Sequence, residues 1–177
     1  MISFSYNLLQ EVSQRVRYTM KKLLLLNSSI IVNKPHLNKD IIKLEYGKNR
    51  IKSYIDGFLK LKENNVYNKF EKVILIDNTV SSVKKLPSKI IDLLPNHTTF
   101  LVSKNNKYGR MNKGAGMLDS LKLNKEIFTD YDLIFYYEPR LLLQSTNFID
   151  EFLSGKKNMF SFESDRRVKT GYFGSNS

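Results

Sequence analysis

Residues 72–77, with the sequence KVILID, decide the fold class of this chain. The run is apolar and rich in β-branched residues, it is too short for a helix, and it is continuous enough for a parallel strand buried on both faces. The polar residues Asp77, Asn78 and Thr79 come directly at its carboxyl end. The run therefore predicts a buried parallel strand with polar side chains at the point where the strand ends.

Helical and strand-like segments alternate on both sides of this run. The spacing of apolar residues predicts helices at residues 8–16, 40–63, 117–129 and 148–153, with a short helix or turn at 88–94. Short apolar runs predict further strands at residues 23–26, 98–103, 131–137 and 159–162. Such alternation requires right-handed crossovers and a mainly parallel sheet covered by helices on both sides. We therefore expect one α/β domain over residues 1–177, with residues 170–177 as a mobile tail without a strong pattern.

The composition excludes several classes of protein. A chain of 177 residues with 41% hydrophobic residues is large enough for a buried core and too apolar for a wholly disordered polymer. The absence of cysteine removes disulfide frameworks, thiolate zinc sites and thiol nucleophiles. The apolar runs at residues 23–26 and 30–32 are too short to span a bilayer. We therefore expect a soluble, cytoplasmic protein.

The net charge of +12 favours an anionic partner, and residues 1–62 alone contribute +8. The partner would be nucleotide phosphates, a nucleic acid or an anionic membrane surface. The alternative explanation of the charge is that the lysines are solvated and bind no partner. No motif of the kind found in RNA-binding domains is present, so we expect no specific nucleic acid partner. Peripheral binding to an anionic membrane and a homo-oligomer both stay open.

Three polar segments follow predicted strands, at residues 77–82, 106–116 and 137–140. In an open parallel sheet, ligands bind beyond the carboxyl ends of the strands. Backbone N–H groups at a helix start, flanked by Arg110 and Lys113, would form a cradle for phosphate. The alternatives are local: an Asx-turn between Asp77 and Thr79, and glycines that serve only turns and close packing.

The order of these segments resembles the nucleotide-sugar-binding half of GT-A glycosyltransferases of the family-2 type, over about residues 21–140. The resemblance implies a nucleotide-diphosphate sugar as donor, bound with its base or ribose at Asp77. It also implies that an Asn/Gly segment lies under the nucleotide and the sugar. Its residues here are Asn106, Gly109, Arg110, Asn112 and Gly114. Residues 1–20 would then be an N-terminal helix and residues 141–177 a short segment on the acceptor side.

The chain departs from the family at Glu138-Pro139-Arg140, where the family has an Asp-x-Asp that holds a divalent metal on the diphosphate. Pro139 keeps Glu138 extended and ends the strand. Mn²⁺ or Mg²⁺ on Glu138 and the phosphates is one interpretation. Arg140 as the cation that neutralises the diphosphate is a second, and an ion pair between Glu138 and Arg140 is a third. With one visible carboxylate, we expect weak metal dependence.

The leading hypothesis is a transferase that moves a sugar to an acceptor glycan or another hydroxyl compound. Glu163 and Asp165 follow the last predicted strand and offer a general base, although both also fit ordinary surface charges. Only 37 residues follow Arg140, so the acceptor site is minimal, is completed by a partner chain, or lies in a longer enzyme. The rivals are a nucleotidyltransferase and a non-catalytic basic module that binds nucleotides or nucleic acid. The first of these would need a glycine-rich loop after the first strand, and residues 27–30 contain no glycine.

Overall fold

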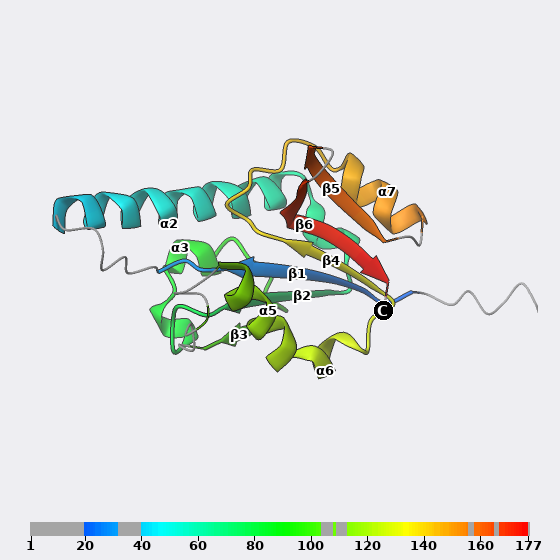
Figure 1. Cartoon of the computed structure of the whole chain (residues 1–177), viewed down its shortest axis with the longest axis horizontal. Helices are drawn as coiled ribbons and strands as arrows, with labels where there is room; N and C mark the ends of the chain where they lie inside the picture. Colours follow the sequence, from blue (N-terminus) through cyan, green and yellow to red (C-terminus); the bar gives the residue numbers. More distant parts are fainter. Residues whose placement is uncertain are drawn as a thin grey trace, which may run out of the picture.

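The computed structural model of the protein describes residues 20–31, 40–103, 108, 113–155, 158–164 and 167–176. The described strands form one sheet in the order β3-β2-β1-β4-β6-β5 (Figure 1). The strands are β1 (Lys22–Ser28), β2 (Lys72–Asp77), β3 (Thr99–Val102), β4 (Leu133–Tyr137), β5 (Met159–Ser164) and β6 (Arg167–Asn176). The helices are α2 (Asp40–Glu63), η1 (Val66–Lys69), η2 (Val83–Lys85), α3 (Ser88–Ile91), α5 (Lys113–Leu123), α6 (Lys125–Phe128) and α7 (Asn147–Gly155).

The four strands β3, β2, β1 and β4 are all parallel, and β6 is antiparallel to both β4 and β5. The expected α/β class with a mainly parallel sheet is therefore confirmed. Strand β2 occupies residues 72–77, as its uninterrupted apolar run predicts. Strand β1 lies between β2 and β4, and Leu25 pairs with Ile74 on one side and with Tyr136 on the other. This central position explains why β1 is an apolar run with no alternation.

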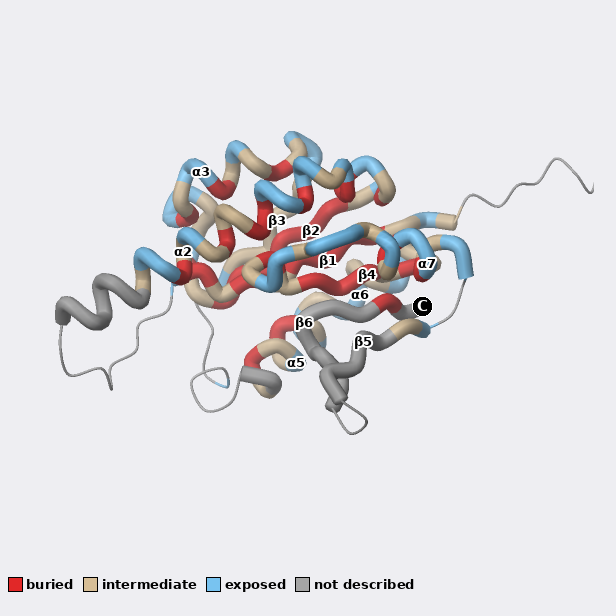
Figure 2. The backbone as a smooth tube through the Cα atoms, turned by 90° about the horizontal axis from the view of Figure 1, so that it is seen from above, coloured by how far each residue is buried: buried red, intermediate tan, exposed pale blue. Residues whose placement is uncertain are grey.

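Helices cover both faces of the sheet because successive strand residues point to opposite sides. On one face, Leu24 and Leu26 of β1 pack in a cluster with Tyr54 and Phe58 of α2 and with residues of α3 and α7. On the other face, Leu23, Leu25 and their neighbours pack against α5 and α6. Figure 2 shows β1, β2 and β4 as the buried centre, with the helices buried mainly along the sides that face it.

The expectation of a mobile tail is wrong for residues 170–176, which belong to β6. The strand signal is weak because two of its residues, Gly171 and Gly174, are glycines, which lower strand propensity. Gly174 is nevertheless required by packing, because a Cβ atom there would lie 2.2 Å from the ring of Phe152 in α7. Tertiary contacts with α7 and pairing with β4 therefore make this strand.

Two smaller expectations also change. The helix predicted at residues 117–129 is divided into α5 and α6 at Asn124, whose side-chain Nδ2 donates to the carbonyl of Ser120 at 2.8 Å. A side chain that bonds to the preceding turn competes with the regular helix. Strand β1 extends beyond the predicted residues 23–26 to Lys22–Ser28, and Ile30 and Ile31 lie outside it. The helix expected at residues 8–16 lies outside the described residues.

Within the described ranges, none of the helices combines the length and the apolar character that a membrane-spanning helix needs.

Candidate functional site

The carboxyl ends of β1 and β4 form the topological switch point of the sheet. After β1 the chain adds β2 and β3 on one side, and it then returns to add β4 on the other side of β1. In open α/β sheets, ligands bind beyond the carboxyl ends of the strands where the order reverses in this way. The register pairs Ser28 with Asp77 and Leu26 with Tyr137, so the loops after β1, β2 and β4 lie along one edge. We call this the carboxyl edge.

Asp77 ends β2 and is fully buried, and its carboxylate accepts four hydrogen bonds from the protein. Oδ2 accepts from the Ser28 hydroxyl at 2.7 Å and from the Ile30 N–H at 2.9 Å. Oδ1 accepts from the Thr79 N–H at 2.7 Å and from the Thr79 hydroxyl. The Asx-turn with Thr79, one of the two interpretations of this residue, is therefore present. Asp77 ties the loops after β1 and β2 together, and its contact with a base or ribose stays a prediction.

The loop after β1 has its backbone donors occupied. The N–H groups of residues 29–31 bond in turn to the Tyr54 hydroxyl at 2.9 Å, the Asp77 carboxylate at 2.9 Å and the Thr79 hydroxyl at 3.1 Å. A phosphate-binding loop instead directs consecutive N–H groups at its ligand. These three amides hold the loop in its conformation. The loop therefore does not present the consecutive N–H donors with which a nucleotidyltransferase would bind phosphate here.

Arg50 of α2 is a component of the carboxyl edge that sequence reasoning missed. It is only 8% exposed, its Nε donates to the Ser29 carbonyl at 2.5 Å, and its guanidinium lies 5.5 Å from the centre of the Tyr54 ring. The apolar spacing of α2 predicts a buried stripe through Ile51, Tyr54, Ile55, Phe58 and Leu59; Tyr54 and Phe58 are fully buried, whereas Leu59 is 40% exposed. The available signal was that Arg50 stands one helical turn before Tyr54, on the same face.

Tyr54 is the second component that was missed, because its place in an apolar stripe suggested packing alone. Burial raises the pKa of its hydroxyl to about 12, against the smaller lowering effect of Arg50 and with a further rise from Glu138. The hydroxyl is therefore neutral at physiological pH, and its oxygen accepts the Ser29 N–H. The loop after β4 packs against the next turn of the same helix, where a Cβ atom on Gly57 would lie 1.6 Å from the Pro139 carbonyl oxygen.

Glu138 and Arg140 form an ion pair through Oε1 and Nε, and their side chains are 21% and 29% exposed. Of the three interpretations, the structure contains the mutual contact. The Leu141 N–H donates to the Glu138 carbonyl at 3.0 Å, so the chain turns directly at Pro139. The two charges neutralise each other, and Glu138 occupies the Nε donor of the guanidinium.

The described residues contain no group of three or more histidine or carboxylate side chains that could hold a metal ion. Glu138 brings one carboxylate to the carboxyl edge, and Arg140 occupies one of its oxygens. Mn²⁺ or Mg²⁺ would therefore need phosphate oxygens for much of its coordination shell. A role of Glu138 in binding metal stays a prediction.

The structure describes only some of the remaining predicted site residues. Asn106, Gly109, Arg110, Asn112 and Asp165 lie outside the described residues, and Gly114 lies in the first turn of α5. Glu163 lies in β5, which runs in the same direction as β4 because β6 is antiparallel to both. The end of β5 and the end of β4 are therefore at the same edge of the sheet, although β6 separates them.

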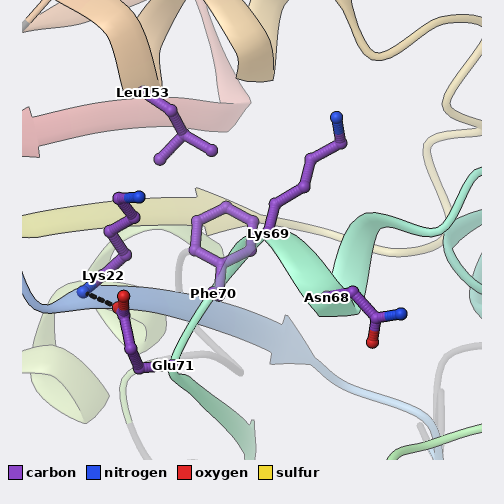
Figure 3. A pocket seen from close by; sticks show the side chains of 6 residues that line it. All are labelled: Lys22, Asn68, Lys69, Phe70, Glu71 and Leu153. Atoms are coloured by element: carbon purple, nitrogen blue, oxygen red, sulfur yellow. Dashed lines mark hydrogen bonds between the residues drawn. The ribbon is translucent and has the colours of Figure 1, made fainter.

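A hollow of about 390 Å³ lies at the opposite, amino end of the strands (Figure 3). The Lys22 N–H donates to the Glu71 carboxylate, and Lys69 pairs with Asp150 of α7 at 2.5 Å. The first contact joins the start of β1 to the residue before β2, and the second joins η1 to α7, so both contacts hold elements of the fold together. The other residues that line it are Asn68, Phe70 and Leu153. A second hollow of about 290 Å³ lies between β3 and α5.

The fold and the carboxyl edge define an α/β protein with a candidate ligand site at the β1–β4 switch point. In sequence, no known protein-family model matches the chain, and no curated protein matches it either.

Proposed function

We propose that this chain is a GT-A-like glycosyltransferase that binds a nucleotide-diphosphate sugar at the carboxyl edge and transfers the sugar to an acceptor hydroxyl. The observation that carries the proposal is the meeting of the loops after β1, β2 and β4 at one edge of the sheet. Asp77 ties the first two loops together, and Arg140 lies beside Glu138 in the third. This is the place where open α/β sheets bind nucleotides. The resemblance over residues 21–140 supplies the class of ligand.

The diphosphate would be neutralised by side chains. The amides of residues 29–31 are already bonded within the protein, so the loop after β1 offers them to no phosphate. Arg140 is a cation on the loop after β4, and its side chain is 29% exposed. A guanidinium binds a diphosphate through two parallel hydrogen bonds, which makes it a good replacement for a metal ion. Weak metal dependence follows from this arrangement.

The leaving nucleotide diphosphate needs a positive charge beside it, and the attacking hydroxyl needs a base that accepts its proton. Arg140 would stabilise the charge that develops on the diphosphate as the glycosidic bond breaks. A carboxylate would accept the proton of the acceptor hydroxyl, and Glu163 and Asp165 are the candidates. The arrangement of the strands supports Glu163, because β5 ends at the same edge as β4.

The test is a thermal-shift panel of UDP, GDP, CDP and ADP and their sugar conjugates, in manganese and in a chelator. A ligand at about 100 times its dissociation constant should stabilise the protein by about 2.7 kcal/mol. Arg140→Ala should remove the shift. Lys52→Ala is the matched control, because Lys52 forms an exposed ion pair with Asp56 at 3.6 Å on α2. If no nucleotide at millimolar concentration shifts the melting temperature, the proposal is wrong.

A further inference from the structure

Two side chains of helix α2 hold the loop after β1, because they bond to both the backbone N–H and the backbone carbonyl of Ser29. The N–H of Ser29 donates to the hydroxyl of Tyr54 at 2.9 Å, and its carbonyl accepts from Nε of Arg50 at 2.5 Å. Arg50 and Tyr54 are one helical turn apart, and the guanidinium rests over the ring. The position of Ser29 is thus fixed by two side chains that are themselves held against each other.

The next turn of the same helix face meets the loop after β4. Gly57 lies so close to that loop that a Cβ atom on it would be 1.6 Å from the carbonyl oxygen of Pro139. Arg50, Tyr54 and Gly57 therefore bring one face of α2 against the loops on both sides of the switch point.

We propose that Arg50 and Tyr54 are positioning residues for the donor site, which set the loop after β1 against the Glu138–Arg140 pair. The inference rests on the proposed function. Both side chains act through Ser29, whose own hydroxyl donates to Asn78 at 3.2 Å and so passes the constraint to the loop after β2. Their effect is to present a preformed edge to the ligand, since a loop that must be ordered on binding lowers affinity.

Two conservative variants remove the hold on Ser29 without removing bulk or charge. Tyr54→Phe keeps the ring and deletes the acceptor of the Ser29 N–H. Arg50→Lys keeps the positive charge and deletes the Nε–H that reaches the carbonyl. Tyr67→Phe is the control, because Tyr67 is also buried and its hydroxyl donates to a carbonyl of the same helix, that of Phe58, at 3.4 Å. Tyr67 lies in η1, which leads into the amino end of β2.

Two measurements are made on each variant. Amide hydrogen exchange of Ser29, measured by NMR without ligand, should become about tenfold faster in Tyr54→Phe and stay unchanged in Tyr67→Phe. Calorimetric titration with UDP, GDP, CDP and ADP should give a dissociation constant at least fivefold weaker in Tyr54→Phe and in Arg50→Lys. The melting temperature of these variants should fall no further than that of Tyr67→Phe.

The possible results separate the inference from the proposed function. If the wild-type chain binds a nucleotide and both variants bind it equally well, the positioning role is wrong and the function stands. If Arg50→Lys retains full affinity while Tyr54→Phe does not, Arg50 acts through its charge and its positioning role is wrong. If the wild-type chain binds none of the four nucleotides, the proposed function fails and the positioning role fails with it, whatever the amide exchange shows.

Discussion

Substitution of Gly57 by alanine should destabilise the protein although alanine is the better helix former. The new Cβ atom would lie 1.6 Å from the Pro139 carbonyl oxygen, and ordinary contact begins at 3.4 Å, so two backbone segments must separate by about 1.8 Å. Overpacking of this kind costs about 1–3 kcal/mol, and occasionally more, while the helix propensity returns about 1 kcal/mol. Because the overlap is deep and the atoms met are backbone, the cost should reach the upper end of that range, about 3 kcal/mol, which leaves a net loss of about 2 kcal/mol.

Gly47 provides the matched control, because it lies in the same helix and a Cβ atom there would meet nothing within 4 Å. Gly47→Ala should stabilise the protein by about 0.5–1 kcal/mol. For a chain of this size, 1 kcal/mol moves the melting temperature by about 2–4 °C. Scanning calorimetry should therefore show a fall of about 4–8 °C for Gly57→Ala and a small rise for Gly47→Ala. Equal rises in both would show that α2 does not press on the loop after β4.

Three further changes have definite expected results. Asp77→Asn should lower the free energy of unfolding in urea by about 1–3 kcal/mol, because an amide cannot accept all four hydrogen bonds; unchanged stability would refute the hydrogen-bond network. Glu138→Gln should tighten nucleoside diphosphate binding about two- to fivefold in a chelator, because Arg140 loses its competing carboxylate; a hundredfold loss together with manganese dependence would instead make Glu138 a metal ligand. The hydrogen bond from Lys69 holds the pKa of Asp150 below its ordinary value, so this contact stabilises the folded chain above about pH 4 and is lost as the pH falls through the lowered pKa. Asp150→Asn should therefore show a smaller drop in melting temperature between pH 7 and pH 3 than the wild type, and equal drops would contradict this sign.

The sequence predicts those elements whose signal is local. Residues 72–77 form β2 as expected, and α2 covers Asp40–Glu63, because a continuous apolar run and a helical stripe each require only neighbours along the chain. Strand β6 has no such signal. Its Gly174 is small because the ring of Phe152 needs the space, which is a fact about packing between distant segments.

The features of the carboxyl edge also fall into two groups, those that follow from the local sequence and those that depend on contacts between distant segments. The position of Asp77 at a strand end follows from the run before it, and β1 places Ser28 opposite Asp77 as a parallel sheet requires. The choice between metal, diphosphate and ion pair at Glu138 depends on side-chain geometry that no spacing encodes. Arg50 was missed because an arginine in a helix reads as a surface charge, and arginines are seldom buried unless they are paired.

The placement of β6 has a consequence for the order in which the chain can fold during synthesis. Although β6 follows β5 in the chain, it lies between β4 and β5 in the sheet, and Tyr172 and Asn176 pair with the two ends of β4. Until residues 167–176 emerge from the ribosome, β4 carries an open row of backbone donors and acceptors, and β5 has no partner. Open edges of this kind pair readily with other chains. The nascent protein is therefore exposed to aggregation between the formation of β4 and its pairing with β6.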